Sequence, residues 1–228
     1  MPPTAPEPEC PARRRIVIVD DHPVLRRGLA ALIESEPDLV VCGESATCRE
    51  ALEVIRESRP DLAIVDLALG EEDGLDLIKD LRARHPEIPA LVLSMHDESV
   101  YAERALKAGA KGYVTKQQLD EALLTAIRRV LDGKRYMSEK VQARLAEKFV
   151  GGRSLDTGSP LAALSDRELQ VFRLIGQGRT TRQIAEALKL SVKTVESHRE
   201  HIKRKLTLHS SAELAQRATQ WVESGRSS

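Results

Sequence analysis

The sequence predicts an α/β fold, a doubly wound parallel sheet of five strands, followed by a small all-α domain that contains a helix-turn-helix. Three observations predict it. In the N-terminal half, five short apolar runs rich in β-branched residues alternate with stretches long enough for crossover helices. The C-terminal part carries only helical signals. Two of its helices are short, a tight turn joins them, and the second is basic.

The apolar runs are the predicted strands. They lie at 16–20, 38–44, 61–67, 89–94 and 111–115. Thr47 and Glu50 have the spacing of a capping box, which predicts that a helix begins after the second run. A doubly wound sheet binds its ligands at the carboxyl ends of its strands, so these ends are where a functional site is expected.

Composition excludes several classes of protein. The chain has 228 residues, with 35 Lys and Arg against 35 Asp and Glu, and is 41% hydrophobic, which is typical of one or two globular domains. No apolar run reaches the ~18–20 residues of a transmembrane helix, and the first twelve residues lack the apolar segment of a secretory signal. Cys10, Cys42 and Cys48 form no CxxC pair, which favours reduced thiols. We expect a cytoplasmic protein with no membrane partner.

The zero net charge conceals two halves of opposite sign. Residues 1–150 carry 22 basic and 27 acidic side chains, whereas residues 161–228 carry 12 and 7. An acidic half joined to a basic half predicts two functions, with a polyanion bound at the C-terminus. The predicted organisation is a disordered proline-rich tail (1–12), the α/β domain (13–133), a linker with a short helix (134–160) and the helix-turn-helix domain (161–228).

Helix starts are marked clearly in the C-terminal domain. Ser165 with Glu168 and Thr180 with Gln183 predict two capping boxes. Ser191 is positioned to cap the basic helix that follows. A last amphipathic helix is predicted at roughly 211–223.

Charged and polar residues gather at the predicted strand ends. Asp20 and Asp21 end the first strand, Asp66 the third and Ser94 the fourth, and Lys116 follows the fifth. Carboxylates that converge at one sheet edge repel each other unless a cation joins them, and oxygen ligands without Cys or His favour Mg²⁺. Lys116 is suited to a phosphoryl oxygen, and Ser94 is a hydroxyl donor. The arrangement is typical of a carboxylate nucleophile with its metal and an anion clamp.

These residues, with Tyr113, stand in the order and spacing of bacterial receiver domains. The segments DLALGEEDGLDLI (66–78), LVLSMHDE (91–98) and AGAKGYVTK (108–116) resemble that family. Residues 164–208 resemble the output domain of NarL/FixJ regulators, which carries a LuxR-type helix-turn-helix. The chain is therefore identified as a member of the two-component response regulators with a flavodoxin-like receiver. One departure is Gly70, where the family usually has a proline, and we expect it to loosen the loop without touching a ligand.

The resemblance implies a role for each residue. Asp66 would accept a phosphoryl group from a sensor histidine kinase, while Lys116 and Ser94 would hold the phosphoryl oxygens. Tyr113 would reorient with them as the switch aromatic. The residues implied to bind Mg²⁺ are Asp66, Asp21, the backbone carbonyl of Ala68 and, through water, Asp20.

Each site residue also has an ordinary structural explanation. Asp20 and Asp21 could cap the next helix, and a lone aspartate at a strand end is usually a cap or turn residue. Lys116 could be solvated and Tyr113 an edge aromatic. Four strand ends nevertheless supply the residue types that one site needs, which favours the site. His22 is expected not to bind a metal, because the histidines lack ligand spacing.

The basic helix is the predicted DNA-binding element. On a wheel of 3.6 residues per turn, Val195, Ile202 and Leu206 form a buried stripe and the opposite face is polar. A solvated face with a Glu200–Arg204 pair is the ordinary alternative. Like charges at i, i+4 disfavour a helix, however, and glutamates can accept a hydrogen bond from cytosine N4 in the major groove. The residues predicted to contact DNA are Lys193, Thr194, Glu196, Ser197, His198, Glu200, Lys203, Arg204 and Lys205, the last three at the phosphates; packing of His198 against its own domain stays open.

Other interpretations compete with a phosphorylation-controlled DNA-binding regulator that dimerises when phosphorylated. The stripe of Leu214, Ala218 and Trp221 on the last helix could be core, although we favour a dimer face. A Mg²⁺-dependent phosphohydrolase of the haloacid dehalogenase type needs a second acid two residues after its nucleophile, and Ala68 stands there. We therefore expect no enzyme beyond self-phosphorylation and slow self-dephosphorylation at Asp66. A receiver that serves only as a dimer module, without phosphorylation, is the remaining alternative.

Overall fold

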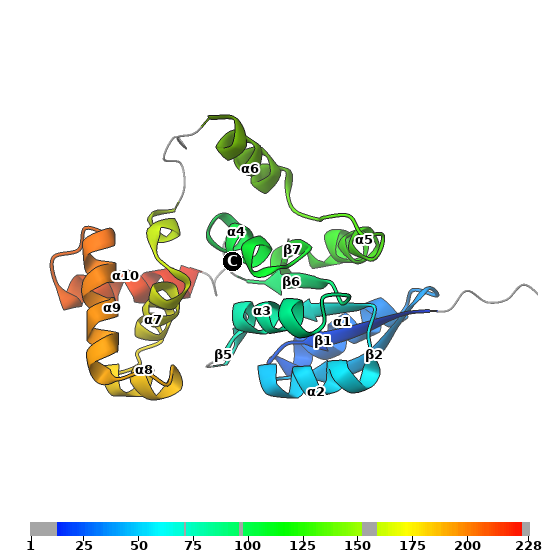
Figure 1. Ribbon diagram of the computed structural model, residues 1–228, viewed down its shortest axis with the longest axis horizontal. Coiled ribbons are helices and arrows are strands. Elements are labelled where there is room, and N and C mark those ends of the chain that lie inside the picture. Colours follow the sequence, from blue (N-terminus) through cyan, green and yellow to red (C-terminus); the bar gives the residue numbers. More distant parts are fainter. Residues whose placement is uncertain (1–12, 71, 96–97, 152–158, 225–228) are drawn as a thin grey trace, which may run out of the picture.

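The computed structural model describes residues 13–70, 72–95, 98–151 and 159–224. The predicted tail at 1–12 lies outside the described residues, as does the middle of the predicted linker. The N-terminal half is built on a five-stranded parallel sheet in the order β2-β1-β3-β6-β7 (Figure 1). Its strands are β1 (Arg14–Val19), β2 (Leu39–Ser45), β3 (Leu62–Val65), β6 (Ala90–Ser94) and β7 (Gly112–Thr115). The predicted doubly wound α/β fold is confirmed.

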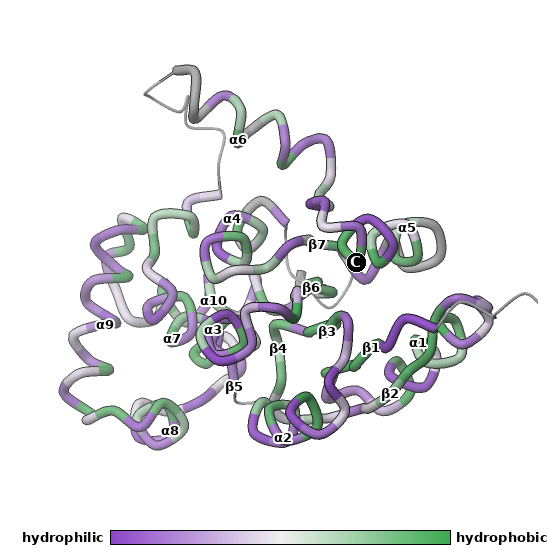
Figure 2. Tube along the Cα trace, turned by 45° about the vertical axis from the view of Figure 1, so that its right-hand side comes forward, coloured by the Kyte–Doolittle hydropathy of each residue, from purple (hydrophilic) through white to green (hydrophobic). Residues whose placement is uncertain are grey.

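Helices cover both faces of this sheet because successive strand residues point to opposite sides. Ile16 and Ile18 of β1 pack towards one face and Val17 and Val19 towards the other, all fully buried. Figure 2 shows the strands as apolar segments between helices of mixed polarity. The first face is covered by α1 (Pro23–Glu34) and α5 (Leu119–Leu131), and the second by α2 (Cys48–Ser58), α3 (Gly74–Arg84) and α4 (Glu98–Ala108).

A small antiparallel hairpin, absent from the sequence prediction, follows β3. It pairs β4 (Ala68–Leu69) with β5 (Glu72–Asp73). Immediately after it, α3 begins so close to the end of β3 that a Cβ atom on Gly74 would lie 2.1 Å from the carbonyl oxygen of Asp66. Only glycine fits there, so the hairpin and the start of α3 are held against Asp66.

The C-terminal domain is helical, as predicted. It is preceded by a linker helix, α6 (Glu139–Gly151), and by a short 3-10 helix, η2 (Pro160–Ala163). A second 3-10 helix, η1 (Lys116–Gln118), lies in the first domain and precedes α5. Within its described residues, the α-helices of the C-terminal domain are α7 (Asp166–Gly176), α8 (Thr181–Ala187), α9 (Val192–Lys205) and α10 (Ser211–Ser224). Both predicted capping boxes are present at the starts of α7 and α8, and the hydroxyl of Ser191 accepts from the amide of Thr194 to cap α9. The pair α8–α9 is the helix-turn-helix.

One apolar core joins the two domains. From the sheet face covered by α4 it continues through Tyr101 to Phe172 of α7 and Trp221 of α10. The rings of Tyr101 and Trp221 stack with centroids 6.2 Å apart, and the Phe172 ring lies 5.7 Å from that of Trp221. The helical domain therefore rests on the α3–α4 side of the sheet (Figure 1). Among the described residues, no helix is both long and apolar enough to cross a membrane.

Candidate functional site

The predicted strand-end residues come together at the carboxyl edge of the sheet. Asp20 and Asp66 follow β1 and β3, which are neighbours, and Lys116 directly follows β7. The Nζ atom of Lys116 donates to Oδ2 of Asp20 at 2.6 Å and to Oδ2 of Asp66 at 2.7 Å. All three side chains are at most 4% exposed. The structure thus brings together residues that are 50 and 96 positions apart in the chain.

Charge in this cluster is not balanced. Burial raises the pKa of the Asp66 carboxyl above its usual range, and Asp20 adds to the rise although Lys116 opposes it. Burial alone would lower the pKa of Lys116, but the carboxylates of Asp66 and Asp20 outweigh it and raise that pKa. One lysine cannot neutralise these two carboxylates and Asp21 beside them. The cluster has the electrostatics of a cation site.

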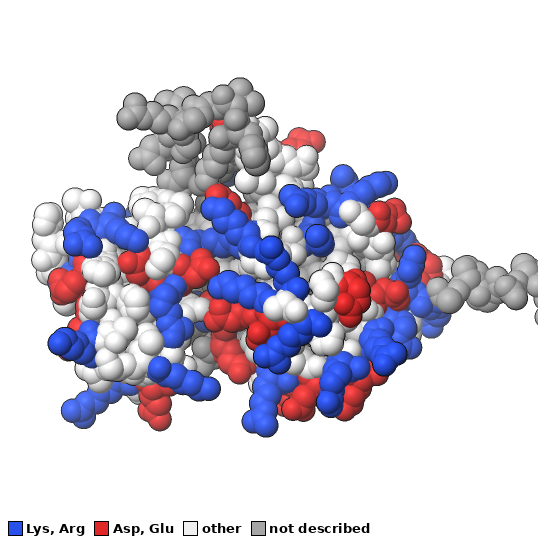
Figure 3. Space-filling model, in the orientation of Figure 1, with Lys and Arg blue, Asp and Glu red and all other residues white. Residues whose placement is uncertain are grey.

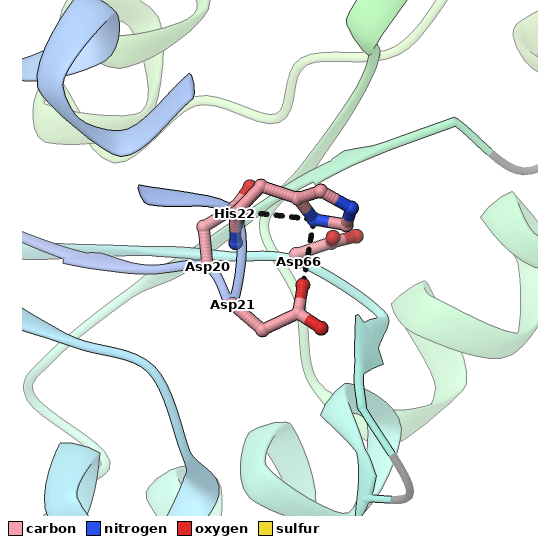
Figure 4. A group of neighbouring side chains, drawn as sticks. All are labelled: Asp20, Asp21, His22 and Asp66. Carbon is pink, nitrogen blue, oxygen red and sulfur yellow. Dashed lines mark hydrogen bonds and ion pairs between the residues drawn. The ribbon is translucent and has the colours of Figure 1, made fainter. Parts of the chain in front are cut away.

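The donor set fits a hard cation. Asp20, Asp21, His22 and Asp66 each place one ligand atom within 4.8 Å of the others (Figure 4). The Oδ1 atom of Asp21 is buried and accepts no hydrogen bond, although Nδ1 of His22 lies 2.7 Å from it. Carboxylate oxygens are the ligands that Mg²⁺ prefers. His22, whose sequence spacing does not indicate a ligand, belongs to this cluster; its position directly after two aspartates was the available signal.

The loop after Asp66 also contacts the cluster. The amide of Ala68 donates to Oδ1 of Asp66 at 3.2 Å, and the amide of Gly70 donates to Oδ2 of Asp21 at 2.9 Å. Gly70 has a φ of +61°, which proline cannot adopt, and a proline would also lack the N–H. The expectation that Gly70 touches no ligand is therefore wrong, because its backbone holds an oxygen of a predicted metal-binding carboxylate.

Ser94 and Tyr113 lie beneath this edge of the sheet. Ser94 ends β6, the neighbour of β3, and is fully buried. Tyr113 of β7 is 1% exposed. Burial raises the pKa of its hydroxyl, and a hydrogen bond with Ser94 opposes this rise. The predicted switch pair is thus in contact, with the ring of Tyr113 turned into the core.

The predicted DNA-binding face of α9 is largely open. Val195 and Ile202 are fully buried and anchor the helix, as the wheel predicts. The predicted contact residues that are exposed are Lys193, Glu196, Ser197, Glu200, Arg204 and Lys205, whereas Thr194, His198 and Lys203 are half-buried. Burial lowers the pKa of His198, and its Nδ1 atom is buried without a hydrogen bond.

The ion pairs of α9 include two that the sequence pattern did not predict, and Glu200 does not take Arg204, its partner in the alternative interpretation. Glu200 instead pairs with Lys203 at 2.9 Å. Lys205 reaches back to α7 and donates to Oε2 of Glu168 at 2.7 Å. Glu168 also closes the capping box with Ser165. Lys205 thus joins α9 to the start of α7. Because its charge is already paired with Glu168, Lys205 is not a free cation available to a DNA phosphate.

We expect Glu168→Gln to lower the free energy of unfolding by about 1 kcal/mol near pH 7, since Lys205 is one-third exposed and its pairing is screened. Burial disfavours the ionised carboxyl, but hydrogen bonds from Lys205 and Ser165 outweigh it and hold the pKa of Glu168 below its ordinary 4.5. Because the folded pKa is the lower one, this stabilisation exists above about pH 4.5 and is lost as the pH falls through the folded pKa. Urea unfolding of both chains near pH 7 and about pH 3.5 measures it, and a pH-independent difference would contradict the pairing.

The stripe on α10 packs inside the chain. Leu214 and Ala218 are fully buried within the helical domain, and Trp221 stacks on Tyr101. In this arrangement neither Leu214 nor Ala218 can form a dimer face, because α7 covers them. The polar contacts between the two domains, made by Arg104, Asp166, Gln170 and Arg173, were not predicted.

Comparison with known proteins matches both halves of the chain. The response regulator receiver domain matches residues 16–128, and the luxR family of bacterial regulatory proteins matches residues 162–218. The chain is 39% identical over 208 residues to the oxygen regulatory protein NreC of Staphylococcus haemolyticus, which covers 90% of this chain and 96% of that protein.

Solved structures show the same similarity. A LuxR-family two-component response regulator from Aurantimonas sp. SI85-9A1 has a TM-score of 0.57 at 37% identity, over 61% of this chain and 99% of the other. The RcsB response regulator of Salmonella typhimurium has a TM-score of 0.73 at 25% identity, over 92% and 98%. RcsB of Salmonella enterica serovar Typhimurium bound to promoter rprA with phosphomimetic BeF3- has a TM-score of 0.70 at 25% identity, over 91% and 98%.

Proposed function

Because this chain belongs to the LuxR-type response regulators, which regulate transcription, we propose that phosphorylation of Asp66 by a sensor histidine kinase controls its dimerisation and its binding to operator DNA. The observation that carries this proposal is the buried contact of Lys116 with both Asp20 and Asp66. This contact places the carboxylate nucleophile, Asp66, and the ammonium group of Lys116 together at the carboxyl edge of the sheet. The proposal places the protein in the cytoplasm, where it meets both the kinase and double-stranded DNA.

The phosphoryl group is transferred to a carboxylate oxygen of Asp66. That oxygen forms a bond to phosphorus while the phosphorus–nitrogen bond of the kinase's phosphohistidine breaks. Lys116 moves from the carboxylates to a phosphoryl oxygen, and Ser94 donates to another. Asp66, Asp21 and the carbonyl of Ala68 would hold Mg²⁺, with Asp20 acting through water. When bound, the ion offsets the negative charge that gathers on the transferred group.

The acyl phosphate then decays slowly. Ala68 stands where a second carboxylate would activate water, and its methyl group can neither accept nor donate a proton. The site therefore favours a phosphoryl group that persists long enough to act as a signal. Self-phosphorylation from a donor and slow self-hydrolysis are the only reactions that we propose for the chain.

Operator binding with and without a phosphodonor tests the proposed function. A binding site is first selected from random DNA, and the Kd is then measured by fluorescence anisotropy with Mg²⁺ and a small phosphodonor. We expect the Kd to fall about tenfold on phosphorylation, within the usual range of coupling between two sites. Sedimentation of the same samples is expected to show more dimer.

The control is Asp66→Asn, which keeps the shape of the side chain but cannot be phosphorylated at this position. Its Kd is expected not to respond to the donor. An equal Kd for the wild-type chain before and after stoichiometric phosphorylation would refute control of DNA binding by Asp66.

A further inference from the structure

An arginine of the helical domain is buried against the loop that follows Asp66. Arg173 of α7 is 4% exposed. Its Nη2 atom donates to the carbonyl oxygen of Glu72 at 3.1 Å, and its Nη1 atom lies 3.4 Å from that of Leu67. Leu67 is the residue directly after Asp66, and Glu72 belongs to β5. A side chain of the second domain therefore holds both ends of the hairpin that contains Ala68 and Gly70.

That hairpin also holds the acidic cluster in its present state. The amide of Ala68 donates to Oδ1 of Asp66, whose Oδ2 accepts from Lys116, so both oxygens of the proposed nucleophile are occupied. The amide of Gly70 donates to Oδ2 of Asp21. The carbonyl of Leu67 and the amide of Ala68 belong to one peptide unit, and Gly70 and Glu72 lie in the same short hairpin. Fixing the carbonyls therefore also fixes the amides.

Gln170, one turn before Arg173, strengthens this contact. Its Nε2 atom donates to Oδ2 of Asp73 at 2.6 Å. Asp73 caps α3 through the amide of Leu75. Burial raises the pKa of Asp73, and the positive charge of Arg173 opposes that rise. The helical domain is thus engaged with the whole segment from Leu67 to the start of α3.

The contact of Arg173 with the loop is incompletely paired. The Nε atom of Arg173 is buried without a hydrogen bond, and a buried charge with incomplete pairing adds little stability. A separate pocket of about 800 Å³ lies between the domains, lined by residues of α3, α4 and η2 and by Asp166 at the start of α7, but not by Arg173. Figure 3 shows acidic and basic side chains crowded together over the meeting of the two domains. The interface thus combines the apolar contact of Tyr101 with Trp221 and incompletely paired polar contacts, and domain interfaces of this mixed kind can open and close.

We propose that Arg173 is a positioning residue of the phosphorylation site, supplied by the helical domain, which holds the Asp66 loop in its unphosphorylated arrangement while the domains are closed. This inference rests on the proposed function of Asp66. Closure and occupancy of the Asp66 site then oppose each other. If binding of a phosphoryl analogue shifts the domains towards the open state, thermodynamic linkage requires the reverse effect to be equally large. Releasing Arg173 must then raise the affinity of the Asp66 site for the analogue by the factor by which the analogue raises the open-to-closed ratio.

The test is the affinity of the full chain for beryllium fluoride with Mg²⁺, measured by isothermal titration calorimetry. Arg173→Met keeps the alkyl stem but removes both contacts to the loop. We expect its Kd to be about 5- to 10-fold lower than that of the wild-type chain. Arg182→Ala, which removes an exposed arginine of the same domain, is the matched control and should leave the Kd unchanged.

A second variant shows whether Arg173 acts through closure. Arg104 of α4 donates to Asp166 at 2.8 Å and to backbone carbonyls of the segment that leads into α7, but hydrogen-bonds none of the described residues of the Asp66 loop. Arg104→Ala should therefore open the domains. Trp221, the single tryptophan of the chain, stacks on Tyr101 across the interface, so its emission should shift to the red. In this open background, adding Arg173→Met should change the Kd no further.

The outcomes separate the inference from the proposed function. If the wild-type chain binds beryllium fluoride no better than Asp66→Asn, the proposed function fails. If the wild-type chain binds it and Arg173→Met has the same Kd, or lowers the Kd equally in the closed and open backgrounds, only the inference is overturned. Should Arg173→Met lose helical circular dichroism, Gln170→Ala takes its place, with a lower Kd again expected.

Discussion

An Asp66→Asn chain is expected to take up no label from a small radioactive phosphodonor in the presence of Mg²⁺, whereas the wild-type chain is labelled stoichiometrically. Asparagine fills the same space beside Lys116 but has no carboxylate oxygen to attack phosphorus. The label on the wild-type chain should be lost at high pH, as an acyl phosphate is. Gel autoradiography measures the uptake of label. Mass spectrometry of peptides, after chemical reduction of the acyl phosphate, locates the labelled residue.

Two controls make this labelling experiment specific. Asp61→Asn changes a carboxylate at the opposite end of β3, where it accepts from the backbone of Arg15, and should leave labelling intact. Chelation of Mg²⁺ should abolish labelling of the wild-type chain, because the buried carboxylates would then repel the donor. Undiminished labelling of Asp66→Asn would move the nucleophile to another residue.

The second large effect is expected on sequence preference at the DNA. Glu196 and Glu200 are exposed on the free face of α9. If they accept hydrogen bonds from cytosine in the major groove, then Glu196→Ala or Glu200→Ala should relax preference at one operator position by roughly 1–3 kcal/mol. Affinity for random DNA should stay the same for Glu196→Ala. It should rise for Glu200→Ala, since Lys203 then loses its carboxylate partner.

Lysine variants provide the contrast. Lys203→Ala should weaken binding to all sequences and reduce the slope of affinity against salt by about one. Lys205→Ala should instead act mainly on stability, because Lys205 is bound to Glu168. Selection from random DNA checks both arguments: an unchanged selected motif for both glutamate variants would mean that these residues are only surface charge.

The acidic cluster could be predicted because a parallel sheet brings the carboxyl ends of its strands to one edge. Asp20, Asp66 and Lys116 needed only this rule and the apolar runs that precede them. Helix starts were predictable for a similar reason, since a capping box lies within four residues of sequence. The features that such local patterns specify are found where they were expected.

Features that depend on which surfaces meet could not be predicted. The stripe of Leu214 and Ala218 indicates a buried helix face, but the pattern is the same whether α7 or a second chain covers it. Arg173 interrupts the apolar run at 171–175 of α7, and the sequence gives no sign that its partner is the backbone of a distant loop. Gly70 was recognisable as a departure, yet its bond to Asp21 depends on a left-handed backbone that one glycine does not reveal.

The caps at the starts of α7, α8 and α9 have a consequence for the order of folding. Each is formed by residues three apart, so the helices of the C-terminal domain can nucleate from contacts that are local in sequence. The sheet instead needs pairings across whole crossovers, such as β1 with β3. Although the helical domain leaves the ribosome last, its own folding should be the faster step. Docking of the two domains then waits for the slower sheet, and with it for the loop that receives Arg173.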